Sequence, residues 1–191
     1  DKEAPTAPEI TNPSNGAWTN GNVTITTKST DAHSGIDKIE WYENGAWTTR
    51  ALTTTDGTGV ITYTADRNET IRFRAVDKAG NASSESTTVV KIDKTSPLDT
   101  APTAISTTNT ITVTSKQTDS LSGIKSGTIQ YAIMKGTTWS AWQTSNQFTG
   151  LTQNTEYKVK TKVTDNAGNT KESLTTTIST KELQAGSLTL T

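Results

Sequence analysis

The sequence predicts an all-β protein made of two similar domains, and three observations support this prediction. Sequence motifs recur at a constant displacement, apolar residues alternate with polar residues along many segments, and threonine is the most abundant side chain, with 43 of 191 positions. An internal repeat indicates duplicated units, and alternation at a spacing of two is typical of β-strands. Together the observations favour strands arranged in a repeated unit.

The repeat is carried by two pairs of motifs, each displaced by 88 positions. VTITTKSTDAHSGI at Val23 recurs as ITVTSKQTDSLSGI at Ile111, and AVDKAGN at Ala75 recurs as VTDNAGN at Val163. The segments between the motifs have diverged, and Ser126-Gly127 resembles a local insertion. A period near 90 residues suits an independently folding domain.

A proline-containing segment marks the boundary between the two copies. Residues 93–97 (DKTSP) resemble the opening residues 1–5 (DKEAP). Proline lacks a backbone donor and restricts φ, so such a segment is typical of a short, semi-rigid linker. We therefore predict one domain over 1–92, a second over 93–181, and the start of a further repeat or a tail over 182–191.

Alternation and composition together favour strands over helices or disorder. Ile71, Phe73 and Ala75 alternate with Arg72 and Arg74, and no helical apolar stripe of ten residues is evident. Threonine is β-branched, which suits a pleated strand, and its hydroxyl keeps the outer face hydrated. Only 30% of the residues are hydrophobic, but a net charge of −1 is unlike that of a disordered chain.

Turn signals about every ten residues divide each domain into seven strands, the pattern of an immunoglobulin-like β-sandwich. In the first domain we expect strands near 7–11, 22–29, 36–43, 46–51, 58–64, 69–77 and 85–92. In the second we expect strands near 102–106, 109–117, 124–134, 139–144, 146–150, 155–164 and 170–180. Trp41 is the expected core tryptophan of the third strand, with Tyr131 as its counterpart.

The motifs D-A-H-S-G-I with V-D-K-A-G-N, and D-S-L-S-G-I with V-T-D-N-A-G-N, resemble those of bacterial immunoglobulin-like repeats. The resemblance implies tandem domains of a secreted or surface protein of bacteria, or of a phage tail protein. The segment Leu151–Tyr157 resembles the fibronectin type III corner, in which a tyrosine hydroxyl bonds nearby backbone. The first domain has ADRNE at 65–69 instead, so this subtype is expected only for the second domain.

Composition argues against several classes of function. A net charge of −1 disfavours binding to nucleic acid or anionic membrane through bulk charge, and no run approaches the ~18 apolar residues of a membrane span. The chain has no cysteine, and its single histidine, His33, lies in a polar loop, so a nucleophile–histidine pair is not expected. Because the chain begins at Asp1 and its one methionine is Met134, we expect an excerpt of a longer polypeptide. No enzyme activity is predicted.

Acidic residues recur in the loops that follow the second and sixth expected strands of each domain. In an immunoglobulin-like sandwich the loops after the second and sixth strands lie at the same end, and the first strand begins there. Carboxylate and amide oxygens are ligands that Ca²⁺ takes. The candidate calcium ligands are Asp31, Asp77, Asn81, Asp93, Asp99, Asp119, Asp165 and Asn169. The alternative is that these aspartates cap tight turns by accepting backbone N–H groups. If calcium binds, we expect it at the junction of the two domains.

A stripe of lysines and several tryptophans form a second candidate site. Lys158, Lys160 and Lys162 should face outward from the sixth strand, and Trp139 and Trp142 follow a turn. The lysines appear unpaired in the sequence pattern and could meet an anionic polymer, whereas a tryptophan face can stack on a sugar ring. The alternatives are that the lysines deter edge pairing and that the tryptophans pack at a sheet edge.

These observations favour a structural role over a catalytic one. We expect a spacer or stalk module of a larger multidomain protein, located outside the cell, on its surface or in a virion. Its expected partners are the neighbouring domains of the same polypeptide, without nucleic acid or membrane insertion. No cofactor other than the candidate Ca²⁺ is expected. The alternative functions are a carbohydrate-binding or adhesin module that contacts cell-surface glycans, and an accessory region of a glycan-degrading enzyme.

Overall fold

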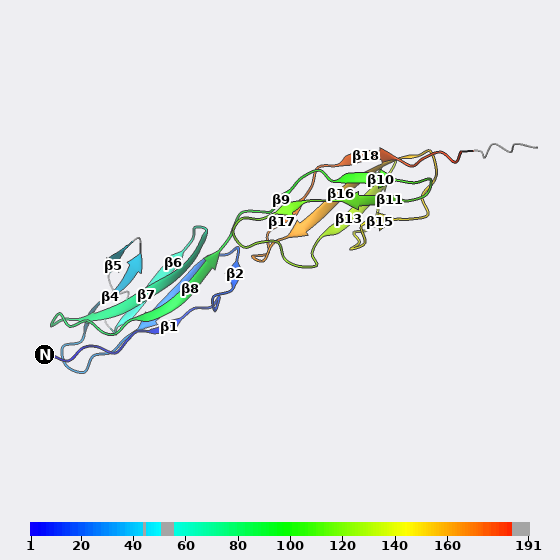
Figure 1. The fold of residues 1–191 in the computed structure, drawn as a ribbon. Coiled ribbons are helices and arrows are strands. Elements are labelled where there is room, and N and C mark those ends of the chain that lie inside the picture. Colours follow the sequence, from blue (N-terminus) through cyan, green and yellow to red (C-terminus); the bar gives the residue numbers. More distant parts are fainter. Residues whose placement is uncertain (44, 51–55, 185–191) are drawn as a thin grey trace, which may run out of the picture. The chain divides into compact units, whose positions relative to one another are not determined.

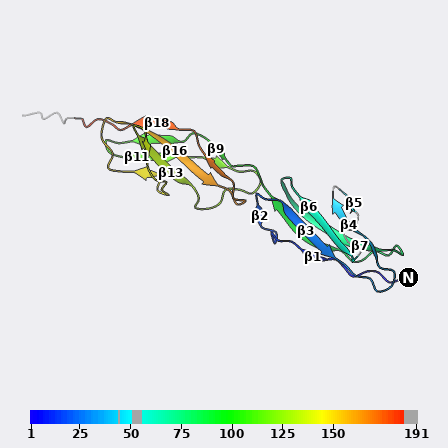
Figure 2. The same cartoon turned by 180° about the vertical axis from the view of Figure 1, so that it is seen from behind.

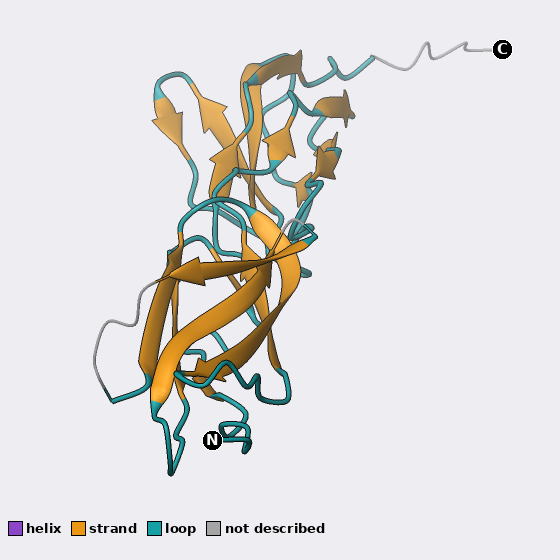
Figure 3. Ribbon diagram, turned by 90° about the vertical axis from the view of Figure 1, so that its left-hand side faces the viewer, coloured by secondary structure: helices purple, strands orange, loops and turns teal. Residues whose placement is uncertain are grey.

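The structure, a computed structural model, describes residues 1–43, 45–50 and 56–184. Within these ranges it contains strands and loops and no helix (Figure 3). The chain divides into two compact units, Asp1–Thr95 and Ser96–Thr191. The predicted all-β fold with two immunoglobulin-like sandwiches in tandem is therefore confirmed. The second unit begins at Ser96, three residues after the expected start at Asp93. Residues 185–191 of the expected further repeat or tail lie outside the described residues.

Unit 1 is a sandwich of two sheets, which Figures 1 and 2 show from opposite sides. The smaller sheet has the strand order β1 (Glu9–Thr11), β3 (Val23–Lys28) and β6 (Thr58–Tyr63). The larger sheet has the order β2 (Trp18–Thr19), β8 (Ser86–Ile92), β7 (Arg67–Asp77), β4 (Ile36–Glu43) and β5 (Ala46–Arg50). All neighbours are antiparallel except β2 and β8, which are parallel. The short strand β2 was not expected from the sequence.

Unit 2 repeats this arrangement with shorter strands (Figure 1). One sheet contains β10 (Thr103–Ser106), β11 (Ile111–Thr114) and β15 (Gln147–Phe148). The other contains β14 (Thr138–Trp139), β13 (Gln130–Lys135), β16 (Glu156–Thr164), β17 (Thr170–Glu172) and β18 (Thr176–Ser179), with both of the last two paired to β16. A separate pair joins β9 (Leu98–Asp99) to β12 (Gln117–Thr118).

The alternating residues of facing sheets form one apolar core in each unit. In unit 1, Ile71 and Phe73 of β7 pack with Trp41 of β4, which is only 4% exposed, as expected for the core tryptophan. In unit 2, Val159 of β16 packs with Val113, and Tyr131 is only half-buried. The fully buried apolar set is smaller in unit 2 than in unit 1. Burial of apolar area is the main favourable term in each unit.

The third strand of unit 2 begins later than the sequence predicted. The expected strand 124–134 is β13, which begins at Gln130. The preceding residues form a turn, because the Thr128 N–H donates to the Lys125 carbonyl and Gly127 has φ of 74°. Only Ile124 keeps a bridge, to Asp165. The Ser126-Gly127 insertion therefore interrupts this strand.

Serine hydroxyls end three stretches of regular pairing. At each site the serine N–H donates to a carbonyl across the ladder, and the N–H of that same partner residue donates to the serine hydroxyl instead of the serine carbonyl. Each hydroxyl then donates to the carbonyl of the next residue. The pairs are Ser83 with Ala75, Ser140 with Ile133, and Ser173 with Thr161. At Ser173 this pairing separates β17 from β18. At Ser140 it ends β14, so that the expected strand 139–144 is reduced to the two residues Thr138–Trp139.

Gly57 lies where a backbone crossing leaves no room for a side chain. It has φ of 82°, and a Cβ atom there would lie 2.1 Å from the Ser29 carbonyl oxygen. The Ser29 N–H donates to the Gly57 carbonyl at 3.1 Å. Glycine is therefore required before β6 both for its positive φ and for the close approach to the chain that follows β3.

Tyr157 forms the corner that the sequence predicted for the second unit. Its ring is buried in the core, and its hydroxyl oxygen accepts a hydrogen bond from the Thr152 N–H at 3.0 Å. This bond ties β16 to the loop that follows β15. The fibronectin type III-like feature is thus present in unit 2.

We predict that Tyr157→Phe lowers the unfolding free energy of unit 2 by about 1–2 kcal/mol, because the Thr152 N–H loses its acceptor. Denaturant unfolding followed by tryptophan fluorescence measures this change. Tyr131→Phe is the matched control, since the Tyr131 hydroxyl lies 3.5 Å from Ser115 Oγ, at the limit of a hydrogen bond. Equal losses in the two variants would contradict a specific corner bond.

Candidate functional site

Three carboxylates meet at one end of unit 1. Asp31 follows β3, Asp77 ends β7, and Asp1 opens the chain; one oxygen of each lies within 4.8 Å of the others. The approach of Asp31 to Asp77 was predicted from the loop positions. Asp1 was not predicted, although the expected start of the first strand at this end was a signal for it.

The same hydrogen bonds hold the two aspartates in both units. Asp77 accepts the Asn81 N–H and side-chain amide, each at 2.7 Å, and Asp165 accepts both groups of Asn169 at 2.8 Å. In the preceding loops, Asp31 accepts the Gly35 N–H at 2.8 Å and Asp119 accepts the Gly123 N–H at 2.6 Å. The repeated motifs therefore encode one repeated pair of capped turns.

In unit 1 these hydrogen bonds favour the ionised carboxylates of Asp31 and Asp77. Burial acts to raise the pKa of Asp77, which is 1% exposed, but the hydrogen bonds from Asn81 outweigh it and the pKa is lowered. The Gly35 N–H lowers the pKa of Asp31, against the opposing effect of its partial burial. Ionised oxygens at this spacing could also ligate a hard cation such as Ca²⁺. Turn capping accounts for the observed bonds, and calcium binding stays a prediction.

Asp93 and Asp99 differ in their surroundings. The Asp93 carboxylate accepts the Thr95 N–H at 3.0 Å, which caps a turn at the end of unit 1. Asp99 of β9 is buried, and its carboxylate accepts hydrogen bonds from Gln117 and Thr161. It does not belong to the groups of converging acidic side chains found among the described residues. Asp99, one of the candidate calcium ligands, therefore lies apart from these groups, because β9 pairs with β12 and directs this side chain into unit 2.

The outer face of the larger sheet of unit 1 carries two arginines bound by carboxylates and aromatic rings. Arg72 makes two 2.7 Å hydrogen bonds to Glu85, and Arg74 lies 2.7 Å from its cross-strand neighbour Glu40 in an ion pair. Burial acts to raise the pKa of Glu40, but bonds from Lys38 and Arg74 outweigh it and lower it. The Arg74 guanidinium also lies 4.2 Å from the centre of the Trp47 ring.

The corresponding face of unit 2 combines the predicted lysines and tryptophans. Lys160 lies 4.6 Å from the ring centre of Trp139 and 5.1 Å from that of Trp142, and Lys162 lies 4.5 Å from that of Trp142. Lys160 also forms a 2.7 Å ion pair with Glu172. The expectation that these lysines are unpaired was therefore wrong for Lys160 and Lys162. The sequence analysis predicted neither the ion pair of Lys160 with Glu172 nor the contacts of the lysines with the indole rings. The reason is that the pairing of β14 and the path of the segment after it were not evident from the sequence.

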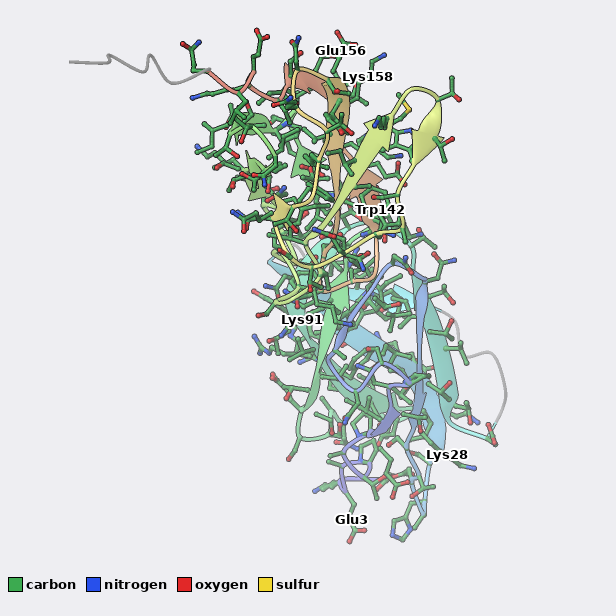
Figure 4. The ribbon with its side chains drawn as sticks, turned by 90° about the vertical axis from the view of Figure 1, so that its right-hand side faces the viewer. Glu3, Lys28, Lys91, Trp142, Glu156 and Lys158 are labelled. Carbon is green, nitrogen blue, oxygen red and sulfur yellow. The ribbon has the colours of Figure 1, made fainter. Side chains whose placement is uncertain are left out.

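Lys158 occupies a different place on β16. It lies with Glu156 toward one end of the strand, whereas Trp142 lies toward the other (Figure 4). Its cross-strand neighbours are Met134 of β13 and Thr177 of β18. The predicted stripe thus divides into a pair of lysines stacked on indoles and one outward lysine. Together the two lysines and two indoles form a cation–aromatic face, defined here as Lys160, Lys162, Trp139 and Trp142.

Two hollows on the surface of the described residues differ in their lining. A groove of about 360 Å³ in unit 2 is lined by Trp139 and by the apolar side chains Ile133, Leu151 and Tyr157, among others. In unit 1 an open hollow is lined by Asp1, Glu3, His33 and Ser34. His33 Nε2 lies 3.1 Å from Glu3 Oε2, and both side chains are largely exposed. An imidazole in this setting forms a surface ion pair when protonated rather than activating a nucleophile.

Each unit has two mainly antiparallel sheets; with the core tryptophan of unit 1 and the tyrosine corner of unit 2, they define the protein as a pair of immunoglobulin-like sandwich modules. Comparison with protein families is consistent with this class. Residues 7–90 match the bacterial Ig domain family, and residues 100–182 match the bacterial Ig-like domain family. The chain therefore belongs to the bacterial immunoglobulin-like families, with one domain of each in tandem.

One curated relative is Exoglucanase B of Cellulomonas fimi. It is 34% identical over 163 residues, which are 80% of this chain and 14% of the relative. The chain thus spans about one seventh of that protein, and the similarity concerns only this part of it.

Two solved structures share the fold at low sequence identity. A segment of titin matches with a TM-score of 0.59 and 15% identity, covering 92% of this chain and 67% of the other. A 1.5-MDa bacterial ice-binding adhesin matches with a TM-score of 0.52 and 18% identity, covering 92% and 65%. Within the part of the chain that the structure describes, no helical segment has the length and apolar character that a membrane crossing requires.

We predict that Asp77→Asn destabilises unit 1 at neutral pH, because an amide cannot accept both Asn81 donors in the same way. Since the folded-state pKa of Asp77 lies below its ordinary value of 3.8, the ionised group stabilises the fold above that value and less as the pH falls through the folded pKa. The difference from wild type should therefore shrink between about pH 5 and pH 2. Unfolding curves across this range measure it.

The exposed Asp37 supplies the matched control. Asp37→Asn should leave the unfolding free energy nearly unchanged at both ends of the range. A pH-independent loss in Asp77→Asn would show that the charge of the turn does not contribute.

Proposed function

We propose that the chain is a non-catalytic spacer of a larger extracellular protein, in which its two domains separate other parts of the polypeptide. The observation that carries this proposal is the pairing of the second strand of unit 1, near its N-terminal end, with its last strand. Strands β2 and β8 are parallel neighbours, with Trp18 opposite Lys91 and Thr19 opposite Ile92. A pull on the two ends of this unit loads their hydrogen bonds together, in shear, rather than opening them one by one.

Unit 2 also ties its ends to each other. The Lys181 N–H, just after β18, donates to the Thr107 carbonyl at 2.8 Å, and Ser106 Oγ of β10 donates to the Ser179 carbonyl at 2.8 Å. Strands joined near both termini resist extension, which suits a module that transmits force between its neighbours.

The relatives support the same reading. The similarity to a small part of Exoglucanase B is consistent with a module attached to a larger secreted protein. The bacterial immunoglobulin-like families and the fold shared with a bacterial adhesin favour a location outside the cell or on its surface. Whether the parent protein is a surface protein, a secreted enzyme with this accessory region or a phage tail protein can be tested by the gene that encodes it.

Force spectroscopy tests the spacer role through one hydrogen bond. The Asp93 N–H donates to the Thr19 carbonyl at 3.0 Å and extends the pairing of β2 with β8. We predict that Asp93→Pro lowers the force at which unit 1 unfolds when the chain is pulled from its termini, because proline has no N–H. Asp93→Ala removes the same carboxylate but keeps the N–H, so it should unfold near the wild-type force. Equal forces in wild type, Asp93→Ala and Asp93→Pro would contradict the proposed shear contact.

A glycan-binding module is the second candidate function, and the cation–aromatic face of unit 2 favours it. Trp139 and Trp142 are half-exposed, and Trp139 lines a groove. A sugar ring would stack on an indole, while the lysines would attract anionic groups of the polymer. Against this candidate, Lys160 and Lys162 already lie over the indole rings, so a sugar would compete with them.

Binding to insoluble polysaccharides separates the two candidates. The spacer role predicts that the chain is not retained on cellulose, chitin or an anionic wall polymer, and that Trp139→Ala and Trp142→Ala change nothing. Trp47→Ala is the matched control, because Trp47 lies under Arg74 in unit 1. Retention that is lost in Trp139→Ala or Trp142→Ala but kept in Trp47→Ala would establish the glycan-binding module instead.

A further inference from the structure

Unit 2 contains a cluster of polar side chains where the β9–β12 pair meets β16. Asp99 of β9 is 6% exposed and Thr161 of β16 is fully buried. The Thr161 hydroxyl lies 2.9 Å from both carboxylate oxygens of Asp99, and Gln117 Nε2 of β12 donates to Asp99 Oδ1 at 2.9 Å. One carboxylate oxygen thus contacts both a hydroxyl and the nitrogen of a primary amide.

At the matching positions of the first copy, all of which the structure describes, there is no such cluster. At a displacement of 88 residues, Thr161 corresponds to Phe73, a core side chain that is 1% exposed, and Gln117 corresponds to Ser29. Asp99 corresponds to Thr11, which is exposed. Burying polar groups costs free energy unless they are fully paired, so their placement in a small core calls for an explanation. The packing of the sandwich does not require them, since unit 1 places an aromatic ring at the matching position.

The cluster contains the groups of an acyl-transfer reaction. Thr161 supplies a hydroxyl nucleophile, Asp99 a general base that touches it, and Gln117 a carboxamide carbon. Ser115 Oγ donates to Gln117 Oε1 at 3.4 Å, which polarises the carbonyl and places a donor where negative charge would develop. Because all the groups belong to one folded unit, their effective concentration is far above that of separate molecules.

We propose that Thr161 and Gln117 form an ester bond within unit 2, with release of ammonia. Asp99 takes the proton from Thr161 Oγ1 as this oxygen attacks Gln117 Cδ. The carboxyl group, which also contacts Nε2, then gives this proton to the nitrogen. The C–N bond breaks, ammonia leaves, and the Oγ1–Cδ bond remains. Hydroxyl and carboxamide become ester and ammonia, so atoms and protons balance and no oxidant or reductant is needed.

Two features of the site suit a lasting ester. Gln117 is half-exposed, so its side chain can rotate toward Thr161 and ammonia can leave to solvent. Thr161 and Asp99 are buried, which keeps water from the bond once it has formed. The link would join β12 to the centre of β16 covalently. This inference does not depend on the spacer role, because it concerns only the chemistry inside unit 2.

Intact-mass spectrometry of the denatured full chain tests the proposal. We expect wild type to be lighter than its sequence mass by one ammonia, and Thr161→Val, Gln117→Ala and Asp99→Asn each to have its full sequence mass. Thr27→Val is the matched control, since Thr27 is a buried threonine of unit 1 that donates to the Gly59 carbonyl. This variant should keep the mass deficit of wild type.

Peptide mapping locates the bond without relying on the variants. In wild type, the proteolytic fragment that contains Gln117 should carry the fragment that contains Thr161, and mild alkali should separate them with the gain of one water. Wild type at full sequence mass would overturn the proposal. A deficit that persists in Thr161→Val would also overturn it, because an asparagine or glutamine elsewhere would then be its source.

Discussion

Side-chain groups complete the backbone hydrogen bonding at the places where the sheets of each sandwich stop, and the rest of the structure depends on this constraint. Buried N–H and C=O groups must be paired, so a strand cannot end inside a sandwich without a substitute partner. Asp77 and Asp165 provide it at the sixth strand by accepting the N–H groups of Asn81 and Asn169. Serine hydroxyls provide it where the last strand leaves the ladder. The loops are held by the same bonds that terminate the strands.

This constraint explains which features could be predicted from the sequence. The motifs D-K-A-G-N and D-N-A-G-N encode their hydrogen bonds within five residues, so the capped turns and the meeting of Asp31 with Asp77 followed from local pattern and topology. Alternation identified the strands of unit 1 almost to the residue, because long strands repeat the pattern several times. The two-residue strands β2 and β9 offer no such repetition and were missed, and β12 was expected only as the end of a strand over 109–117.

The cation–aromatic face shows why side-chain partners were harder to predict than strands. The outward direction of Lys160 and Lys162 follows from alternation along β16. Their partners come from β14 and the residues after it, where Ser140 ends regular pairing and sets the path of Trp142. Alternation of residues between the two faces of a strand does not apply to that segment, so it could not predict the path. A lysine that looks unpaired in sequence therefore gained an indole in the structure, as Arg74 of unit 1 did with Trp47.

The two copies keep one framework and stabilise it differently. Unit 1 fills its centre with apolar residues that include Phe73, whereas unit 2 has a smaller apolar core and places Thr161 and Asp99 there instead. A net hydrogen bond contributes only about 1 kcal/mol, so the polar cluster alone replaces a large aromatic side chain poorly. A covalent link between β12 and β16 would act differently, because it closes a long loop and restricts the unfolded chain, by about 4 kcal/mol on the loop-closure relation derived for disulfides. In a domain with few apolar residues and no cysteine, a bond between side chains of ordinary polar type is one means of stabilising a thin sandwich.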